Sequence, residues 1–297
     1  MNKYVIVTDT ACDLEKSFRE EFSIEYVQMH YALDGQDYLA SLDWNPISAP
    51  DFYDLMRNGK RFITAQVNIE QYKAAFKEYI EEGYDVLYIA CSSRISASIN
   101  ASLMARKEIL EEYPNAKIIC VDSLRACYAL GLLVIRAAEL RGEGKTIEEV
   151  AEWVEQNRQT VHMIGSVDKL TWLKQAGRVS ATSAFFGGLL NIKPIIIADA
   201  QGRNFAIEKL KGRKNSFNRI VEMAKEEFVD VPYQRVFISH ADCLEEAEQL
   251  KKMLLEALGK DIPVHIGYVG PGVGASVGPG MIGVYFYGNE VTVNKEE

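Results

Sequence analysis

Short runs of consecutive apolar residues alternate with helical stretches in the first half of this chain, and this pattern restricts its fold most strongly. The apolar runs span residues 3–9, 24–33, 85–92 and 117–123. Uninterrupted runs of this length are typical of strands that are covered on both faces. Helical patterns span about residues 69–83, 98–112 and 126–141. The alternation predicts an α/β domain whose mostly parallel sheet is flanked by helices on both sides.

The second half of the chain predicts a further, mixed α/β domain. Two strand-like runs, residues 193–199 and 205–210, are separated by the turn-like sequence AQGR and indicate a hairpin. At 297 residues, the chain is long enough for two domains of ordinary size. We therefore expect an N-terminal domain of residues 1–160 and a C-terminal domain of residues 161–297. No low-complexity linker separates the halves, so we expect the two domains to pack closely.

Composition and charge argue against several classes of protein. A hydrophobic fraction of 48% with 25% charged residues is typical of a globular protein with a substantial core. The formal net charge of −9 argues against a nucleic-acid-binding protein that neutralises phosphates. No apolar run reaches the roughly 18 residues of a membrane-spanning helix. The five cysteines form no CxxC pair, which predicts reduced thiols, a cytoplasmic location and no metal site.

Small polar side chains follow the predicted strands of the first domain. In an open parallel sheet, ligands gather beyond the carboxyl ends of the strands. The polar residues at these positions are Thr8, Asp9, Thr10, Thr64, Gln66, Ser92, Ser93, Ser96, Ser98, Asp122 and Ser123. Together with the N-termini of the following helices, they offer hydrogen-bond donors to an anion at one edge of the sheet. The alternative is that many of the hydroxyls only cap helices, because Ser and Thr are favoured caps.

The sequence carries no recognisable catalytic motif. It has no GxSxG segment, and none of its four histidines belongs to a known partner motif. A phosphatase of the haloacid-dehalogenase type would need a second Asp two positions after Asp9, where this chain has Ala11. Among the histidines, His240 follows an apolar run and is the strongest candidate for a functional role.

The segment GPGVGASVGPG, residues 270–280, contains five glycines and two prolines. It does not match a Walker loop, because Met281 and Ile282 follow its last glycine. It does not match a dinucleotide fingerprint either, because it leads into another strand-like run. The segment therefore predicts a loop between two strands. Such a loop either makes a plain turn or lets a ligand approach the bare backbone closely.

Eight segments, taken in order, resemble the DegV family of bacterial fatty-acid-binding proteins over essentially the whole chain. They are VTDTACDL, ITAQVN, CSSRISASINAS, VDSLRA, LTWLKQAGRVS, LLNIKPII, KLKGRK and GASVGPGMIGVYF. The resemblance implies two α/β domains that hold one long-chain fatty acid in a tunnel between them, with no other cofactor. Several family members serve as the binding subunit of a fatty-acid kinase, presenting the acyl carboxylate to a separate ATP-using subunit. The resemblance thus implies a lipid-binding protein with no catalysis of its own.

The resemblance also assigns residues to the binding of the carboxylate. They are Thr64, Ser93, Ser96, Arg178, Gly274, Ala275 and Ser276. Ser276 departs from the family, which has a histidine at this position. The tunnel wall is expected from the apolar side chains of Phe185, Phe186, Leu189 and Leu190. Arg213 lies in a basic segment of this acidic chain and is expected to contact the kinase subunit; the alternative is a solvated basic face.

Two other classes of function stay open. The first is a small-molecule phosphotransferase, because the family's first domain resembles that of dihydroxyacetone-type kinases. Those enzymes bind their substrate covalently through a histidine, and His30 is the only histidine in the first 160 residues. The second is a transcriptional regulator, against which the net charge of −9 argues. The acyl-chain length and the oligomeric state do not follow from the sequence.

Overall fold

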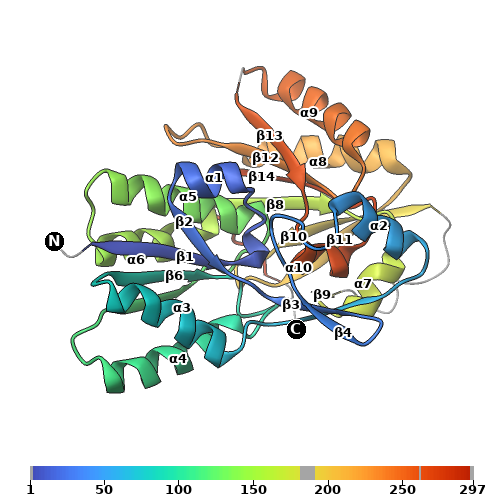
Figure 1. The fold of residues 1–297 in the computed structure, drawn as a ribbon. Helices are drawn as coiled ribbons and strands as arrows, with labels where there is room; N and C mark the ends of the chain where they lie inside the picture. Colours follow the sequence, from blue (N-terminus) through green and yellow to red (C-terminus); the bar gives the residue numbers. More distant parts are fainter. Residues whose placement is uncertain (1–2, 181–190, 261, 295–297) are drawn as a thin grey trace.

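The computed structural model describes residues 3–180, 191–260 and 262–294, which form three sheets surrounded by helices (Figure 1). Sheet A has the strand order β2-β1-β6-β7, and all its strands are parallel. Its strands are β1 (Tyr4–Asp9), β2 (Ile24–Val27), β6 (Asp85–Ala90) and β7 (Ile118–Asp122). The central strand β6 is buried along its whole length, as its continuous apolar sequence predicts.

Helices cover both faces of sheet A, as predicted (Figure 1). On one face lie α3 (Ile69–Glu81) and α4 (Ser98–Glu112), and on the other lie α5 (Tyr128–Gly142) and α6 (Ile147–Asn157). Capping boxes begin α3 and α6, with Asn68 and Gln71 in the first and Thr146 and Glu149 in the second. The short helix α1 (Lys16–Glu21) and the 3-10 turn η1 (Thr10–Cys12) complete this layer.

Helix α5 is largely apolar because it lies between two sheets. Its sequence, YALGLLVIRAAELRG, has eleven buried residues. One side of α5 contacts β1, β2 and β6, and the other contacts strands of the C-terminal half. A helix whose apolar residues extend around most of its surface is typical of a position covered on two sides.

Sheet B is a small antiparallel sheet of order β4-β3-β5. Its strands are β3 (His30–Leu33), β4 (Gln36–Leu39) and β5 (Phe62–Ala65), and α2 (Ala49–Arg57) packs beside it. The prediction of one strand over residues 24–33 was therefore wrong. The apolar pattern is continuous there, but the chain leaves sheet A after Val27 and enters sheet B at His30.

Sheet C is formed by residues from Val161 onward and has the order β13-β12-β14-β8-β10-β11-β9. The pairs β12–β13 and β11–β9 are parallel, and the others are antiparallel. The hairpin expected from the AQGR turn is confirmed by β10 and β11. The strands are β8 (Val161–Ser166), β9 (Val179–Ser180), β10 (Ile192–Ala198), β11 (Asn204–Lys211), β12 (Val236–His240), β13 (Val264–Tyr268) and β14 (Ile282–Tyr287).

In the described part of the C-terminal half, four helices and a 3-10 turn accompany sheet C. Helices α8 (Arg213–Glu227) and α9 (Leu244–Leu258) pack together over a second apolar core. The shorter elements are η2 (Arg158–Thr160), α7 (Leu170–Ala176) and α10 (Pro271–Val277). The glycine-rich segment was predicted to be a loop, and this prediction was wrong. Pro271 begins a short helix there, since proline is favoured in the first helical turn.

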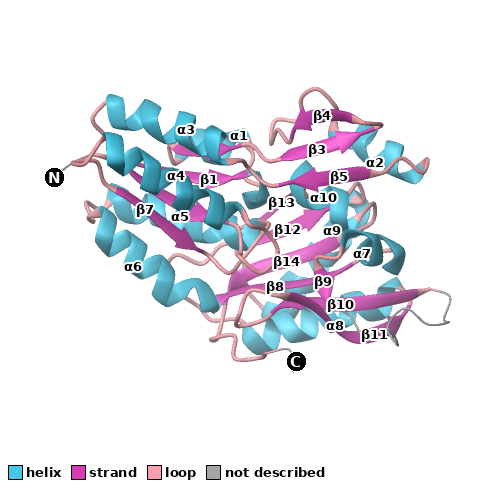
Figure 2. Cartoon of the chain, turned by 90° about the horizontal axis from the view of Figure 1, so that it is seen from below, coloured by secondary structure: helices cyan, strands magenta, loops and turns pink. Residues whose placement is uncertain are grey.

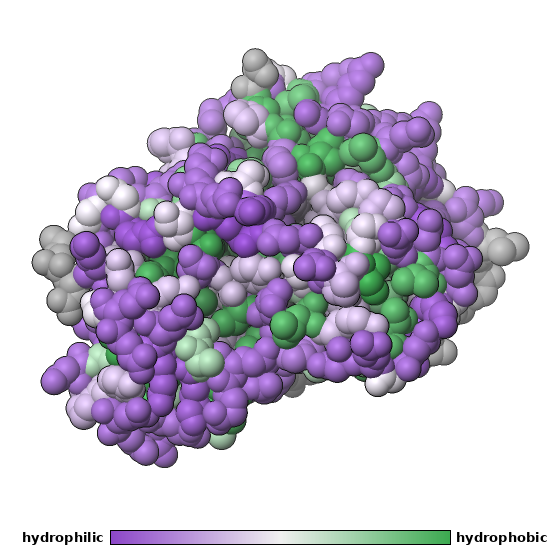
Figure 3. All heavy atoms as spheres, in the orientation of Figure 1, coloured by the Kyte–Doolittle hydropathy of each residue, from purple (hydrophilic) through white to green (hydrophobic). Residues whose placement is uncertain are grey.

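Helix α10 joins parts of the chain that are far apart in sequence. It contacts β5 of sheet B, the turn η1 that follows β1, and helix α7 (Figure 2). Polar side chains predominate on the face of the molecule in Figure 3 and are interrupted by smaller apolar patches. In the part of the chain that the structure describes, we find no helix that is long and apolar enough to cross a membrane.

Candidate functional site

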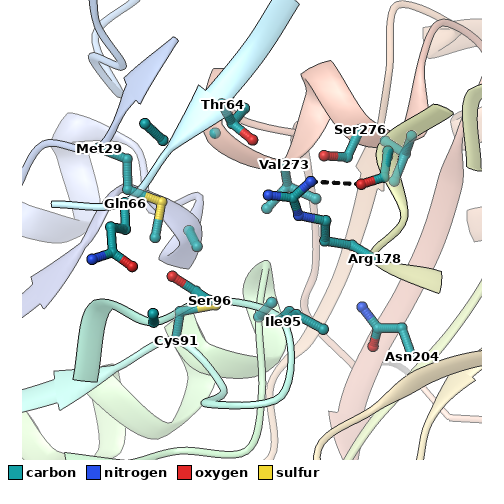
Figure 4. Close-up of a pocket in the computed structure, with 17 residues that line it drawn as sticks. Met29, Thr64, Gln66, Cys91, Ile95, Ser96, Arg178, Asn204, Val273 and Ser276 are labelled. Carbon is teal, nitrogen blue, oxygen red and sulfur yellow. Dashed lines mark hydrogen bonds between the residues drawn. The ribbon is translucent and has the colours of Figure 1, made fainter. Parts of the chain in front are cut away.

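A cavity of about 440 Å³ lies where the three sheets meet (Figure 4). Its walls come from the ends of β1 and β6, from β5, from the start of α4, from residues 176–178, from β11 and from α10. The carboxyl ends of parallel strands thus contribute to it, as predicted for a ligand site of an open α/β sheet. Its polar lining residues are Thr64, Gln66, Ser96, Arg178, Asn204 and Ser276.

The structure brings four of the predicted carboxylate-binding residues into this cavity, namely Thr64, Ser96, Arg178 and Ser276. Thr64, Arg178 and Ser276 lie together on one side, and Ser96 lies with Gln66 on the other (Figure 4). Ala275 lines a smaller adjoining cavity of about 50 Å³, which shares Thr64, Arg178 and Ser276 with the first. The tunnel residues Phe185, Phe186, Leu189 and Leu190 lie outside the described residues.

Two predicted residues lie outside the cavity lining. Ser93 is exposed, and its backbone N–H donates to Asp122 Oδ1 at 3.2 Å. Gly274 is buried within α10, where the Tyr53 hydroxyl occupies the space that a Cβ would need. Gly274 therefore shapes the helix that carries Ser276, and it does so from the side packed against α2.

The glycines of residues 270–280 allow neighbouring side chains to approach α10 closely. A Cβ at Gly270 would lie 2.6 Å from Asp13 Oδ1, and one at Gly272 would lie 3.2 Å from Thr10 Cγ2. At Gly278, where φ is +74°, a Cβ would overlap the indole ring of Trp172. The bare backbone thus has a packing role on one side, whereas Val273 and Ser276 face the cavity.

Arg178 supplies the positive charge of the cavity. Among the described residues that line it, Arg178 is the one charged side chain. Its Nη1 donates to the Ala176 carbonyl at 2.6 Å, and its guanidinium points in beside Val273 and Ser276 (Figure 4). Burial raises the pKa of the Cys91 thiol well above its ordinary value, so this lining residue stays neutral. The part of the lining that the structure describes therefore has a positive charge and no carboxylate to compensate it.

The start of α4 adds further donors at the cavity wall. Ser96 and Ala97 line the cavity, and Ala97 is the N-cap of α4 without a side-chain capping bond. The first turn of this helix carries no acidic residue. Ser96 Oγ lies 2.9 Å from Ser98 Oγ and accepts a bond from Ser98 N at 3.2 Å. The other N–H groups of the first turn and the positive end of the helix dipole favour an anion here.

The remaining polar candidates have structural partners. Asp9 accepts hydrogen bonds from Ala11 N at 3.0 Å, Tyr88 Oη at 2.8 Å and Cys91 N at 3.0 Å. His240 is buried, and burial lowers its pKa. The side chain of Arg213 is mostly buried. Its Nη2 lies 2.6 Å from Glu246 Oε2 and donates to the Gly280 carbonyl at 2.7 Å.

Sequence reasoning missed several lining residues, including Met29, Ile95, Asn204 and Val273. Asn204 begins β11 immediately after the hairpin turn, and its local sequence does not mark it as a site residue. Met29 lies between sheets A and B, in a segment that was predicted to be strand. Their place in the cavity depends on how distant elements meet, which no local pattern records.

Comparison with known proteins is consistent with this fold. The DegV family model, described as "Uncharacterised protein, DegV family", matches residues 3–289. A DegV domain-containing protein of Clostridium perfringens is 39% identical over 290 residues, which are 97% of this chain and 99% of the relative.

Two solved structures share the fold over 97% of this chain and 100% of theirs. One is a DegV family protein from Thermus thermophilus described by its fatty acid binding, with 26% identity and a TM-score of 0.84. The other is DegV from Bacillus subtilis, described as a fatty acid binding protein, with 27% identity and a TM-score of 0.83. Because the family model and the Clostridium relative also extend over nearly the whole chain, the chain belongs to the DegV family, as its ordered motifs predict.

Proposed function

We propose that this chain binds a long-chain fatty acid in the cavity between its three sheets. The observation that carries the proposal is that the described lining of one cavity combines one arginine, several hydroxyl groups and apolar side chains and contains no carboxylate. Thr64, Ser276 and Arg178 would hold the acyl carboxylate, with the start of α4 across the cavity. The fatty-acid binding described for the Thermus and Bacillus relatives supports the same ligand class.

Burial of the acyl chain is the larger energetic contribution to this binding. About 15 methylene groups at roughly 0.8 kcal/mol each give about 12 kcal/mol of gross burial, from which association takes back several. One charge-assisted hydrogen bond contributes about 1.5 to 3 kcal/mol. The serine at position 276, in place of the family's histidine, therefore weakens binding without abolishing it.

We further propose that the protein is a carrier without chemistry of its own, built as domains of residues 1–160 and 161–297. The titratable groups in the described cavity lining are the Cys91 thiol and the Arg178 guanidinium, and neither suits acid–base catalysis near neutral pH. We also propose, more specifically, that the protein presents the fatty acid to a kinase subunit and that Arg213 lies in the surface that contacts this subunit. The ion pair of Arg213 with Glu246 would have to be shared with the partner or broken.

Lipid extraction tests the proposed function directly. We expect mass spectrometry of an organic extract of the purified protein to detect long-chain fatty acids in roughly stoichiometric amounts. The delipidated protein should take up added palmitic acid with saturable binding, because the cavity has apolar walls and a compensating charge. If no acyl chain is recovered and palmitic acid does not bind, the proposed function is wrong.

A charge-neutral variant of Arg178 tests the assignment of the head group. We expect Arg178→Gln to weaken palmitate binding about tenfold, which corresponds to about 1.4 kcal/mol. The matched control is Arg61→Gln, because Arg61 lines the adjoining small cavity and not the main one. It removes the same charge from the same face, so equal losses in the two variants would indicate general electrostatic attraction and not direct contact with the carboxylate.

A further inference from the structure

The carboxyl group of Asp13 is buried and poorly satisfied by its surroundings. Its side chain is 3% exposed, and although the Cys127 thiol and the Gly270 N–H lie nearby, neither oxygen accepts a hydrogen bond of ordinary geometry from the described residues. It lies at the end of η1 with a φ of 58°, a left-handed conformation that Asp and Asn adopt more readily than most residues. Asp13 therefore has a defined backbone conformation, and no cation of the described residues pairs with its carboxyl group.

The carboxyl group touches the segment that begins α10. Asp13 Oδ1 lies 2.6 Å from the place that a Cβ on Gly270 would occupy, and Gly270 is the N-cap of α10. The residues of α10 then line the ligand cavity with Gly272, Val273, Ser276 and Val277. The position of Asp13 against Gly270 is thus linked mechanically to one wall of the cavity.

The surroundings of Asp13 favour its uncharged form. Burial raises the pKa of this carboxyl well above its ordinary value, and the nearby Cys127 thiol and Gly270 amide only partly offset the effect. The charged groups that act on it, Glu15 and Asp9, are acids as well. The other titratable groups that interact electrostatically with Asp13 are Cys12, Cys91, Cys127, Tyr53, Tyr128 and Tyr285.

We propose that Asp13 is a positioning residue for the ligand cavity, seating Gly270 and α10 against η1 as a neutral carboxyl and loosening them when it ionises. A carboxylate at this place needs solvation, and displacement of Gly270 is the direct way for water to reach it. Such a displacement moves Val273 and Ser276 and weakens ligand binding. The inference rests on the proposed function, because the ligand is taken to bind against α10.

The test compares wild-type protein with Asp13→Asn, which keeps the shape of the neutral carboxyl and cannot ionise. Dissociation constants for palmitic acid are measured by calorimetry on delipidated protein between about pH 5.5 and 9.5. The ionisation of the ligand affects both proteins equally, so it cancels in the ratio of the two constants. We expect wild type and variant to bind alike at the acid end and the wild type to bind at least about threefold more weakly at the alkaline end.

A second variant distinguishes an effect of Asp13 ionisation from an effect of altered packing around α10. Gly274→Ala disturbs α10 from the Tyr53 side without touching Asp13, so it should weaken binding by the same factor at every pH. If both proteins bind palmitic acid but the ratio of their dissociation constants does not change with pH, the positioning role alone is overturned. Absence of binding by both proteins at all pH values overturns the proposed function, and this inference with it.

Discussion

Asp13→Asn is expected to stabilise the folded protein at pH 7, by about 1 to 3 kcal/mol. Most substitutions of buried residues destabilise, so the sign of this effect is diagnostic. The wild-type carboxyl is buried beside other acids, and no hydrogen bond of ordinary geometry reaches it from the described residues. Asn removes the ionisable proton, keeps the size of the side chain and fits the left-handed backbone at this position.

The stabilisation should depend on pH in a defined direction. In the unfolded chain an Asp carboxyl titrates near pH 3.9. In the folded protein burial raises the pKa of Asp13, so above about pH 4 the folded state retains a proton that the unfolded state has lost. The wild type therefore loses stability as the pH rises from about 4 toward the raised pKa. Asp13→Asn has no such loss, and its advantage should grow over the same interval.

Urea denaturation of both proteins from about pH 4 to 8 measures this difference. The matched control is Asp9→Asn, four residues earlier on the other side of η1. Asp9 accepts three hydrogen bonds, from Ala11 N, Tyr88 Oη and Cys91 N, and an amide NH₂ would oppose one of these donors. Burial raises the pKa of Asp9 as well, but its three donors oppose that effect, and losing one of them should dominate. We therefore expect Asp9→Asn to destabilise by about 1 to 3 kcal/mol. Destabilisation by Asp13→Asn at pH 7 would contradict the account given for Asp13.

The sequence predicts those parts of the fold in which a local pattern is compatible with only one kind of structural element. The continuous apolar runs of β6 and β7 predicted covered parallel strands, and the largely apolar sequence of α5 is explained by its place between two sheets. Residues 24–33 show the limit of such patterns. Their hydrophobicity continues while the chain changes sheets between Val27 and His30, so the change leaves no mark in the sequence.

The glycine-rich segment failed as a prediction for a different physical reason. Glycine disfavours helix in isolation, so local propensity argued for a loop. The helix α10 forms because its glycines admit η1 and Tyr53 at close range, and tertiary packing outweighs propensity. The Tyr53 hydroxyl also donates to the Val269 carbonyl at 2.6 Å, a contact between residues 216 positions apart. Contacts over such separations are invisible to local patterns.

The residues of the candidate site also include some that short motifs predict and others that depend on the packed structure. Thr64, Ser96, Arg178 and Ser276 were predictable because short motifs mark them, and the structure places them in one cavity. Ser93 carries an equally good motif, yet its side chain is exposed. The motif fixes only that a polar turn follows β6, and which hydroxyl faces the cavity depends on the turn geometry. Asp13 lies in the first motif, but the poor satisfaction of its carboxyl group emerges only from the packed structure.

Among single substitutions, replacement of Arg125 is expected to weaken the connection between the two halves of the chain most. Arg125 is 1% exposed and lies between β7 and α5. Its Nε donates to the Val161 carbonyl at 2.7 Å, and its Nη1 donates to the carbonyls of Leu124 at 2.8 Å and Asp199 at 3.2 Å. Burial lowers the pKa of Arg125 to about 10, so the guanidinium stays charged at neutral pH.

We expect Arg125→Met to lower the free energy of unfolding by about 3 to 5 kcal/mol, although Met fills a similar volume. The loss arises because the buried carbonyls of Val161 and Asp199 lose a charged donor at the start of β8 and the end of β10. Arg158→Gln is the control: Arg158 also donates to a carbonyl, that of Asp122 at 2.7 Å, but it is partly exposed to water. We expect Arg158→Gln to lower the free energy of unfolding by less than about 1 kcal/mol. Urea denaturation that ranks the two variants equally would mean that water or rearranged backbone replaces the guanidinium, and that Arg125 does not hold the halves together.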